Sequence, residues 1–181
     1  MNKRKSSAIV CAIGAIIALV LSMAPDMRSV NGNPLRFSKQ ALEIMANAEG
    51  CRRDPYLCPA RIATQGIGHT GEGVGLAPAA NDETIARWFA MDAMDAQNCI
   101  ERNVENKLGF QLPQGVFDGI GSFIFNAGCS KFLTSTLYRH LLDMAYTAAC
   151  DQLSRWVYGG GKKLPGLIER RAKERALCLG N

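Results

Sequence analysis

The sequence predicts a single α+β domain that is mostly helical and carries a minor sheet. In most segments after residue 38, apolar residues recur at intervals of three and four, which is the spacing of amphipathic helices. Between Asp54 and Pro78 this spacing gives way to a Gly- and Pro-rich stretch with short runs typical of small strands joined by turns. A chain of 181 residues can bury a substantial core, so we expect one folded domain over residues 38–181.

Residues 1–25 form a segment of a different kind, with a basic start and a weakly apolar body. The basic residues Lys3, Arg4 and Lys5 precede an uncharged run of about the ~17–20 residues that a membrane-spanning helix needs. Nine of the nineteen residues from Ser6 to Ala24 are Ala, Gly or Ser, so the run has only a weak preference for a bilayer. We therefore predict an N-terminal transmembrane signal-anchor segment of marginal hydrophobicity.

Three interpretations of this segment stay open: a cleaved signal peptide, a permanent anchor, or an anchor that can leave the membrane. Ser22 and Ala24 have the spacing of a cleavage site, but Pro25 would follow the cut and disfavour it. All three interpretations predict export, with the basic N-terminus left in the cytoplasm.

The remaining elements follow in order along the chain. Residues 26–37 are rich in Asn, Gly, Pro and Ser and are predicted to be a linker. Ser38 can cap a helix that Gly50 ends, which puts Glu49 in its last turn. A hairpin-like sheet should follow. Further helices are predicted over residues 81–105, with Asn81 as the cap, and over 113–126, 134–142, 146–156 and 166–178.

Charge and composition exclude several classes of function. The formal net charge of +5 falls to +2 when the three basic residues at positions 3–5 are set aside, which is too mild for nucleic-acid binding. The basic run over residues 162–175 is interpreted as a solvated helix face. Two isolated histidines offer no metal-ligand spacing, and the glycines near residue 70 lack the Lys-Ser/Thr ending of a phosphate loop, so no metal or cofactor is expected.

Seven cysteines suit an exported chain in an oxidising compartment. Cys11 lies in the membrane segment, so the other six could pair without it. Cys51 and Cys58 flank a turn-prone Asp54-Pro55 and could approach closely enough for a disulfide. The remaining four are expected to be structural, and their simplest pairing is Cys99 with Cys129 and Cys150 with Cys178, although four cysteines allow three pairings.

Glu49 is a candidate general acid. At a helix C-terminus it meets the negative end of the backbone dipole, which, with partial burial, favours the protonated carboxyl that a general acid needs. An exposed glutamate in a final helical turn is the ordinary alternative. The spacing of three residues decides between them. Eight residues separate Glu49 from Cys58 and five separate Cys58 from Thr64, and this pattern resembles that of the phage-type lysozymes, glycoside hydrolase family 24. FIFNAG (residues 123–128) and PGLIERRAKE (residues 165–174) resemble two further segments of that family.

This resemblance implies a lysozyme-like fold, in which a small lobe with a short β-sheet and a larger helical lobe are joined by a long helix, here over residues 81–105. It also implies roles at the site. Glu49 would protonate the glycosidic oxygen between N-acetylmuramic acid and N-acetylglucosamine, and Thr64 would position a water on the opposite face. Cys58 stands where many relatives have Asp; we interpret it as the general base, with a nucleophilic role as the alternative.

The stretch GCRRDPYLCP resembles the disulfide-caged signal-anchor-release endolysins. That resemblance implies an enzyme for host-cell lysis that is tethered to the inner membrane, facing the periplasm, and later soluble in the periplasm. A Cys51–Cys58 bond would hold the tethered form inactive, and after release, triggered by membrane depolarisation, Cys11 would take Cys51 and free Cys58. Its partners would be peptidoglycan and, before release, the host inner membrane, and we expect a monomer.

Two rival functions remain at this point. Cys58 with His69 could form the dyad of a thiol hydrolase, in which the histidine activates the cysteine. Alternatively, the chain could be a catalytically inert cell-wall-binding protein that keeps the lysozyme fold, although the presence of Glu49, Cys58 and Thr64 together argues against this.

Overall fold

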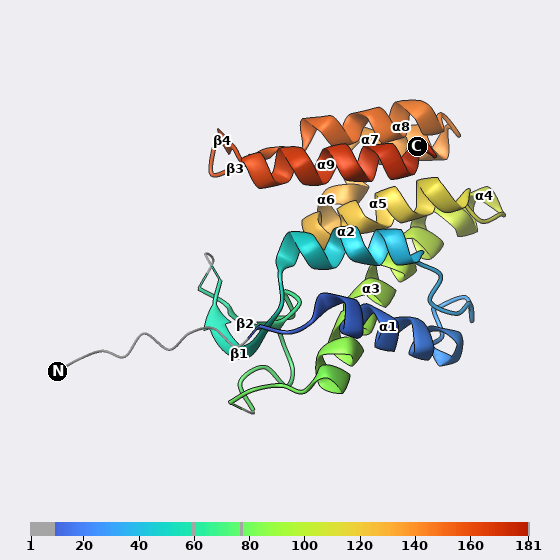
Figure 1. The fold of residues 1–181 in the computed structure, drawn as a ribbon. Helices are drawn as coiled ribbons and strands as arrows, with labels where there is room; N and C mark the ends of the chain where they lie inside the picture. Colours follow the sequence, from blue (N-terminus) through green and yellow to red (C-terminus); the bar gives the residue numbers. More distant parts are fainter. Residues whose placement is uncertain (1–9, 59–60, 77, 181) are drawn as a thin grey trace.

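The computed structural model describes residues 10–58, 61–76 and 78–180, and its helices outnumber two small hairpins (Figure 1). This confirms the predicted α+β class. The helices are α1 (Ile13–Met23), α2 (Lys39–Glu49), α3 (Asp82–Ile100), α4 (Asn106–Leu108), α5 (Gln114–Ala127), α6 (Cys129–Leu133), α7 (Thr136–Leu142), α8 (Tyr146–Gln152) and α9 (Pro165–Cys178), with the short turns η1 (Ala24–Asp26), η2 (Glu101–Glu105) and η3 (Leu153–Arg155). The strands are β1 (Arg52–Leu57), β2 (Ala63–Gly66), β3 (Tyr158–Gly159) and β4 (Lys162–Lys163).

The predicted caps of α2 and α3 are confirmed. Ser38 accepts a hydrogen bond from the backbone N–H of Ala41 at 3.2 Å, and Gly50 ends α2 at a φ of 72° that favours glycine. Asn81 caps α3 by accepting from the backbone N–H of Thr84 at 2.8 Å. Helix α3, shown in green in Figure 1, runs from the hairpin region to the larger group of helices, as predicted for the connecting helix.

The first hairpin is present, but the turn predicted inside it is wrong. Asp54 and Pro55 lie within β1, which pairs antiparallel with β2 in a register that sets Tyr56 opposite Thr64. The pairing is irregular between Arg52 and Tyr56, and an irregular two-stranded ribbon tolerates a proline that cannot donate to the ladder. The chain reverses only after Cys58.

Helix α1 packs into the same core as the rest of the domain. One face, formed by Ile16, Ile17 and Val20, is buried, and α1 contacts both α2 and α3. Figure 1 shows it in dark blue beside α3. Among the helices over the described residues, none combines the length and the apolar character needed to cross a bilayer. The basic residues Lys3, Arg4 and Lys5 lie outside the described residues.

The segment 26–37, expected as a linker, is folded in this structure. Leu35 and Phe37 are buried, and the backbone N–H of Leu35 donates to the carbonyl of Ala24, which directly follows α1 and begins η1. Its polar composition reflects hydrogen bonds to buried groups rather than solvation, as described below.

Three disulfides join elements that are distant in sequence. Cys99–Cys129 links α3 to α6, and Cys150–Cys178 links α8 to α9. These are the simplest of the pairings that the sequence allows. The third disulfide, Cys11–Cys51, ties the residues before α1 to the residue before β1.

Helices α5 and α9 approach each other closely because glycines line one face of α5. A Cβ on Gly115 would lie 2.7 Å from the carbonyl oxygen of Leu177, and one on Gly119 would lie 2.5 Å from that of Glu174. Side chains at these positions would push α9 away. The two glycines therefore let α9 pack directly against α5.

Candidate active site

Glu49 lies at the C-terminal end of α2, where two hollows of the surface meet. A cleft of about 380 Å³ is lined by Glu49 and Asn126 together with Gly68, Asp92 and Asp95. A second groove, of about 570 Å³, lies between α2 and α9 and is also lined by Glu49 and Asn126. The Glu49 side chain is 27% exposed, so the carboxyl is accessible from the cleft while part of it contacts protein.

The protein contact of Glu49 is an ion pair with α9. Nη1 of Arg170 donates to Oε1 of Glu49 at 2.6 Å, although the two residues are 121 positions apart. Arg170 is almost fully buried, so the pair is desolvated on one side. The sequence-based expectation considered the helix dipole and partial burial at Glu49 and did not foresee this cation.

Arg170 belongs to a buried charge network within α9. Glu174, with no exposed surface, accepts from Nε of Arg170 at 2.9 Å, from Ser122 at 2.7 Å and from Arg171. Burial lowers the pKa of Arg171, while the charge of Glu174 opposes that shift. Arg171 also donates to the side chain of Asn126 in the cleft wall. The interpretation of residues 162–175 as a solvated helix face is therefore wrong for these three buried side chains, because carboxylates and backbone carbonyls compensate the charges.

Cys58 and Thr64 lie at the far end of the hairpin. Cys58 is half-buried and lies outside the three disulfides; its backbone N–H donates to the carbonyl of Ile62 at 3.0 Å. Thr64 is 2% exposed, and its hydroxyl donates to the same carbonyl at 3.0 Å. The loop that closes the hairpin thus orders both residues around one carbonyl group.

Tyr56 is a residue of this region that the sequence reasoning missed. It lies opposite Thr64 in the hairpin, and the guanidinium of Arg52 sits 4.8 Å from the centre of its ring. Burial raises the pKa of the Tyr56 phenol, and the charges of Glu49 and Cys58 add to this while Arg52 opposes it. The phenol therefore lies in the electrostatic field of both predicted catalytic groups. Its position two residues before Cys58, near the end of β1, was the available signal.

His69 is held by partners other than Cys58. Its Nδ1 lies 2.9 Å from Asp92, its Nε2 lies 3.4 Å from the carbonyl of Glu72, and its ring stacks on Trp88 at 4.9 Å. Burial raises the pKa of Asp92, and the hydrogen bond from His69 opposes that shift. Both ring nitrogens are thus engaged, which favours a structural role for His69 and not the thiol-hydrolase dyad. Over the described ranges, no group of three or more acidic, His or Cys side chains is placed to hold a metal.

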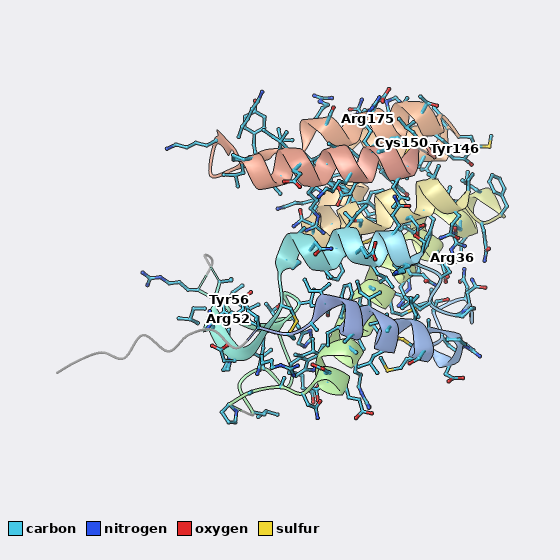
Figure 2. All side chains as sticks on the ribbon, in the orientation of Figure 1. Arg36, Arg52, Tyr56, Tyr146, Cys150 and Arg175 are labelled. Atoms are coloured by element: carbon cyan, nitrogen blue, oxygen red, sulfur yellow. A yellow bond between two sulfur atoms is a disulfide. The ribbon has the colours of Figure 1, made fainter. Side chains whose placement is uncertain are left out.

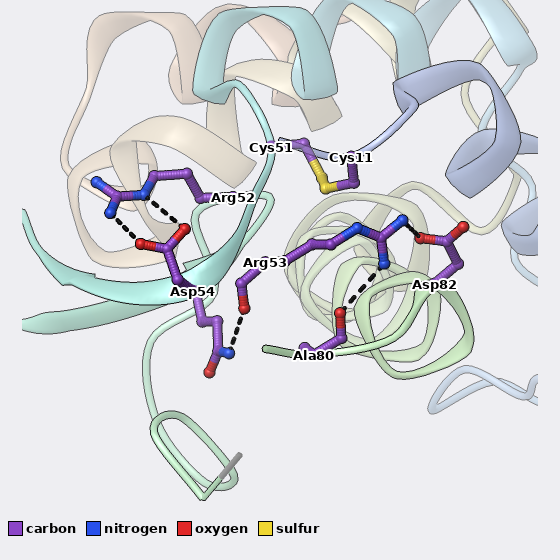
Figure 3. Close-up of a disulfide and its surroundings, with 8 residues drawn as sticks. Cys11, Cys51, Arg52, Arg53, Asp54, Ala80 and Asp82 are labelled. Atoms are coloured by element: carbon purple, nitrogen blue, oxygen red, sulfur yellow. Dashed lines mark hydrogen bonds and ion pairs between the residues drawn. A yellow bond between two sulfur atoms is a disulfide. The ribbon is translucent and has the colours of Figure 1, made fainter. Parts of the chain in front are cut away.

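The Cys11–Cys51 disulfide lies beside the start of β1 (Figure 3). Val10 forms an isolated antiparallel bridge with Arg52, so the chain before α1 extends the edge of the hairpin. The Arg53 side chain extends toward Asp82 at the start of α3, with which it pairs, and donates to the carbonyl of Ala80 at 3.2 Å (Figure 3). In this structure Cys51 is thus bonded to Cys11 and not to Cys58.

A long helix joining a small hairpin region to a larger helical group, with a glutamate in the cleft, defines a lysozyme-type glycoside hydrolase. Residues 46–174 match the model of the phage lysozyme family, and the chain belongs to that family. It is a muramidase, and lysozymes of this family act on peptidoglycan.

The similar proteins include phage endolysins. The SAR-endolysin of Escherichia phage P1 is 34% identical over 94% of this chain and 91% of its own, and that of Haemophilus phage HP1 (strain HP1c1) is 30% identical over 99% and 100%. The crystal structure of the active form of P1 phage endolysin Lyz matches with a TM-score of 0.81 at 32% identity, covering 97% of each chain. The secreted inactive form of that protein matches with a TM-score of 0.56 at 33% identity, covering 80% of this chain and 96% of that one. The present structure is thus more similar to the active form.

A Gly68→Ala variant should lose turnover through a direct effect on Glu49. Gly68 has a φ of +71°, and a Cβ there would lie 3.2 Å from Oε2 of Glu49, so alanine would strain the backbone and displace the carboxyl. We expect a loss of stability of about 1–2 kcal/mol from the left-handed conformation. We also expect a fall in turnover that stays below the ~10²-fold loss typical of a 1 Å misplacement, because the contact requires the predicted acid to move by only a few tenths of an ångström.

The matched control is Gly75→Ala, where φ is +80° but no atom lies within 4 Å of the added Cβ. It should lose similar stability and keep its turnover, measured as loss of turbidity of permeabilised Gram-negative cells. Equal turnover losses in the two variants would contradict the contact with Glu49.

Proposed function

We propose that this chain is an endolysin that is exported in an inactive, membrane-tethered form and activated by release and disulfide exchange. The observation that carries the proposal is the Cys11–Cys51 disulfide, which joins the predicted anchor segment to the cysteine predicted to cage Cys58. The similarity to proteins named SAR-endolysins supports it. Before release the enzyme would face the periplasm from the host inner membrane; afterwards it would act on peptidoglycan as a soluble monomer.

In the catalytic step, Glu49 would donate its proton to the leaving glycosidic oxygen. Cys58 would act as the general base and Thr64 would position the attacking water. The hydroxyl of Thr64 donates its hydrogen bond to the carbonyl of Ile62, so the lone pairs of its oxygen remain able to accept a hydrogen bond from a water. Arg170 would be a positioning residue that holds one oxygen of Glu49 and leaves the other for the substrate.

The exchange step balances without an external oxidant. The thiolate of Cys11 attacks the sulfur of Cys51, the Cys11–Cys51 bond forms, the Cys51–Cys58 bond breaks, and Cys58 leaves as a thiolate. In the membrane, Cys11 is shielded and forms no thiolate, so the tethered enzyme stays silent.

The exchange also requires β1 to be rebuilt. Seven residue steps of extended strand separate Cα atoms by roughly 20 Å, whereas a disulfide needs about 4.4–6.8 Å. A Cys51–Cys58 bond is therefore incompatible with β1 as it stands between these cysteines. Forming Cys11–Cys51 would let the strand extend and pair with β2, which would set Thr64 and Cys58 in place.

The test measures the length of the membrane-bound and soluble forms and the activity of variants that lack single cysteines. Newly made protein should fractionate with membranes and later become soluble at the same length. Released Cys11→Ser should be inactive until a reductant is added, whereas Cys51→Ser and the Cys11→Ser/Cys51→Ser double variant should be active without it. A soluble form that begins near Met23 or Pro25 would refute release without cleavage, and full activity of released Cys11→Ser under oxidising conditions would refute the switch.

The role of Cys58 has its own prediction. Cys58→Asp should keep substantial activity because a carboxylate restores a general base with a pKa near ~3.9, ionised at neutral pH. It should also be active from the start, since no cage can form. Cys58→Ser, which has neither a base nor a cage, is the matched control and should be the weaker enzyme. A thiol hydrolase would lose activity in both variants.

A further inference from the structure

The segment between η1 and α2 is built as a strap that lies against the end of α3. We define the strap as residues 29–36. It begins with a tight reversal, in which the backbone N–H of Ser29 donates to the carbonyl of Asn33 at 2.8 Å. Near its other end the backbone N–H of Leu35 donates to the carbonyl of Ala24, the residue that directly follows α1, so the strap is fastened to the C-terminal end of α1.

The first anchor of the strap is Glu101, whose side chain is fully buried. Its carboxylate accepts from the side-chain amide of Asn33 at 3.1 Å and from the backbone N–H of Asn31 at 3.3 Å. The third donor is Gln97, one turn earlier on α3, at 2.9 Å. The strap therefore supplies two of the three hydrogen bonds that satisfy a buried carboxylate.

The second anchor is Glu105, which is 4% exposed. It accepts from Nη2 of Arg36 at 2.5 Å and from the backbone N–H of Leu112 at 2.8 Å. The guanidinium of Arg36 also lies 3.9 Å above the ring of Phe117 on α5. A buried ion pair with a stacked guanidinium fixes this end of the strap in one geometry.

The side chain of Gln97 forms two hydrogen bonds with the backbone of the strap. Its side-chain oxygen accepts from the N–H of Arg36 at 3.0 Å, and its side-chain nitrogen donates to the carbonyl of Pro34 at 2.9 Å. Both anchors, Glu101 and Glu105, come from η2, which is a π-helical turn. Such turns are rare and are frequently found at functional sites.

We propose that the strap is a latch that fixes the C-terminal end of α1 on the enzyme and thereby favours formation of the Cys11–Cys51 disulfide. The inference deepens the proposed function and rests on it for its biological meaning. Helix α1 is held at both ends, by Cys11–Cys51 before its first turn and by the strap after its last. Figure 2 shows Arg36 near the start of α2 and far from Arg52 and Tyr56 in the hairpin, so the two attachments lie at opposite ends of α1.

The physical consequence is an increase in effective concentration. With the strap docked, the apolar face of α1 meets α2 and α3 in one orientation, and Cys11 is delivered to the start of β1. With the strap loose, the same helix would be joined to the domain by a flexible loop. Because the coupling between two equilibria is reciprocal, the Cys11–Cys51 bond in turn stabilises the docked strap by the same factor.

The experiment measures the stability of this disulfide in the purified soluble chain. In a Cys58→Ser background, Cys11 and Cys51 are equilibrated with oxidised and reduced glutathione. Two thiols and one oxidised glutathione give the disulfide and two reduced glutathiones, and peptide mapping gives the ratio. Arg36→Ala and Asn33→Ala should each lower the effective concentration of the pair about tenfold, which corresponds to losing about 1.4 kcal/mol from the strap.

Lys39→Ala is the matched control, because it removes a cation three residues further on whose partner, Glu43, is exposed with it. It should leave the equilibrium unchanged within twofold. If Arg36→Ala failed to fold, Asn33→Ala would decide, with hydrogen exchange of α1 as a second readout that should rise when the strap is loosened. The latch proposal would be refuted if the strap variants had the same Cys11–Cys51 disulfide equilibrium and the same hydrogen exchange in α1 as the wild-type chain.

The outcome of the glutathione experiment does not depend on whether the chain is tethered to a membrane. The glutathione equilibrium uses no membrane and no substrate, so it can fail while release and lysis proceed as proposed. Conversely, a chain that proved to be cleaved after export would refute the tether and leave the measured coupling between strap and disulfide in place.

Discussion

A Glu49→Gln variant should fold normally and lose about 10²–10⁴-fold of its rate of peptidoglycan hydrolysis, the range expected for removal of a general acid. The amide cannot give the leaving oxygen a proton, yet its carbonyl can still accept from Arg170, which also keeps Glu174. Turbidity loss of permeabilised cells and analysis of the released muropeptide ends would measure the change.

Glu43→Gln is the control for this experiment, since Glu43 lies on the same helix and lines the groove but pairs with Lys39. It should keep most of its activity. Near-normal turnover by folded Glu49→Gln protein would contradict the assignment of Glu49 as the acid.

A Glu174→Ala variant should be destabilised by about 3–5 kcal/mol, the usual result of leaving buried charges without their partner. Glu174 is the carboxylate shared by Arg170 and Arg171, so its loss leaves two buried guanidinium groups with one remaining carboxylate, Glu49. Denaturant unfolding followed by far-ultraviolet circular dichroism would measure the loss.

The comparison is Glu169→Ala on the same helix, where the pair with Lys173 is exposed on both sides. That variant should unfold at an unchanged denaturant concentration. If the Glu174 variant behaved in the same way, the network would not be the element that fixes α9 beside Glu49.

Much of the helical part of the fold could be predicted because local signals determine it. Ser38, Gly50 and Asn81 mark helix ends through hydrogen bonds and backbone angles that depend on a few neighbouring residues. The position of Glu49 in the last turn of α2 followed from the same signals. The fit of its spacing with Cys58 and Thr64 to a known family then pointed to the cleft.

The parts that could not be predicted are segments whose amino-acid composition is compatible with two different environments. A weakly apolar run such as Ile13–Met23 suits a bilayer and equally suits a groove between α2 and α3. Asn31 and Asn33 have the composition of a linker, but their donors satisfy a carboxylate that lies 68–70 residues away. Arg170 and Arg171 resembled surface charges because their partners are distant in sequence or on the buried side of α9.

The ion pair between Glu49 and Arg170 also has a consequence for the timing of biosynthesis. The chain is made from the N-terminus, so the helix that carries the acid is complete long before the residue that holds its carboxyl, 121 positions later, has been added. The disulfide that fastens α9 to α8 needs Cys178, which is added later still. A chain cut off before α9 would therefore contain Glu49 without Arg170, the cation that holds its carboxyl, and Cys150 without its disulfide partner.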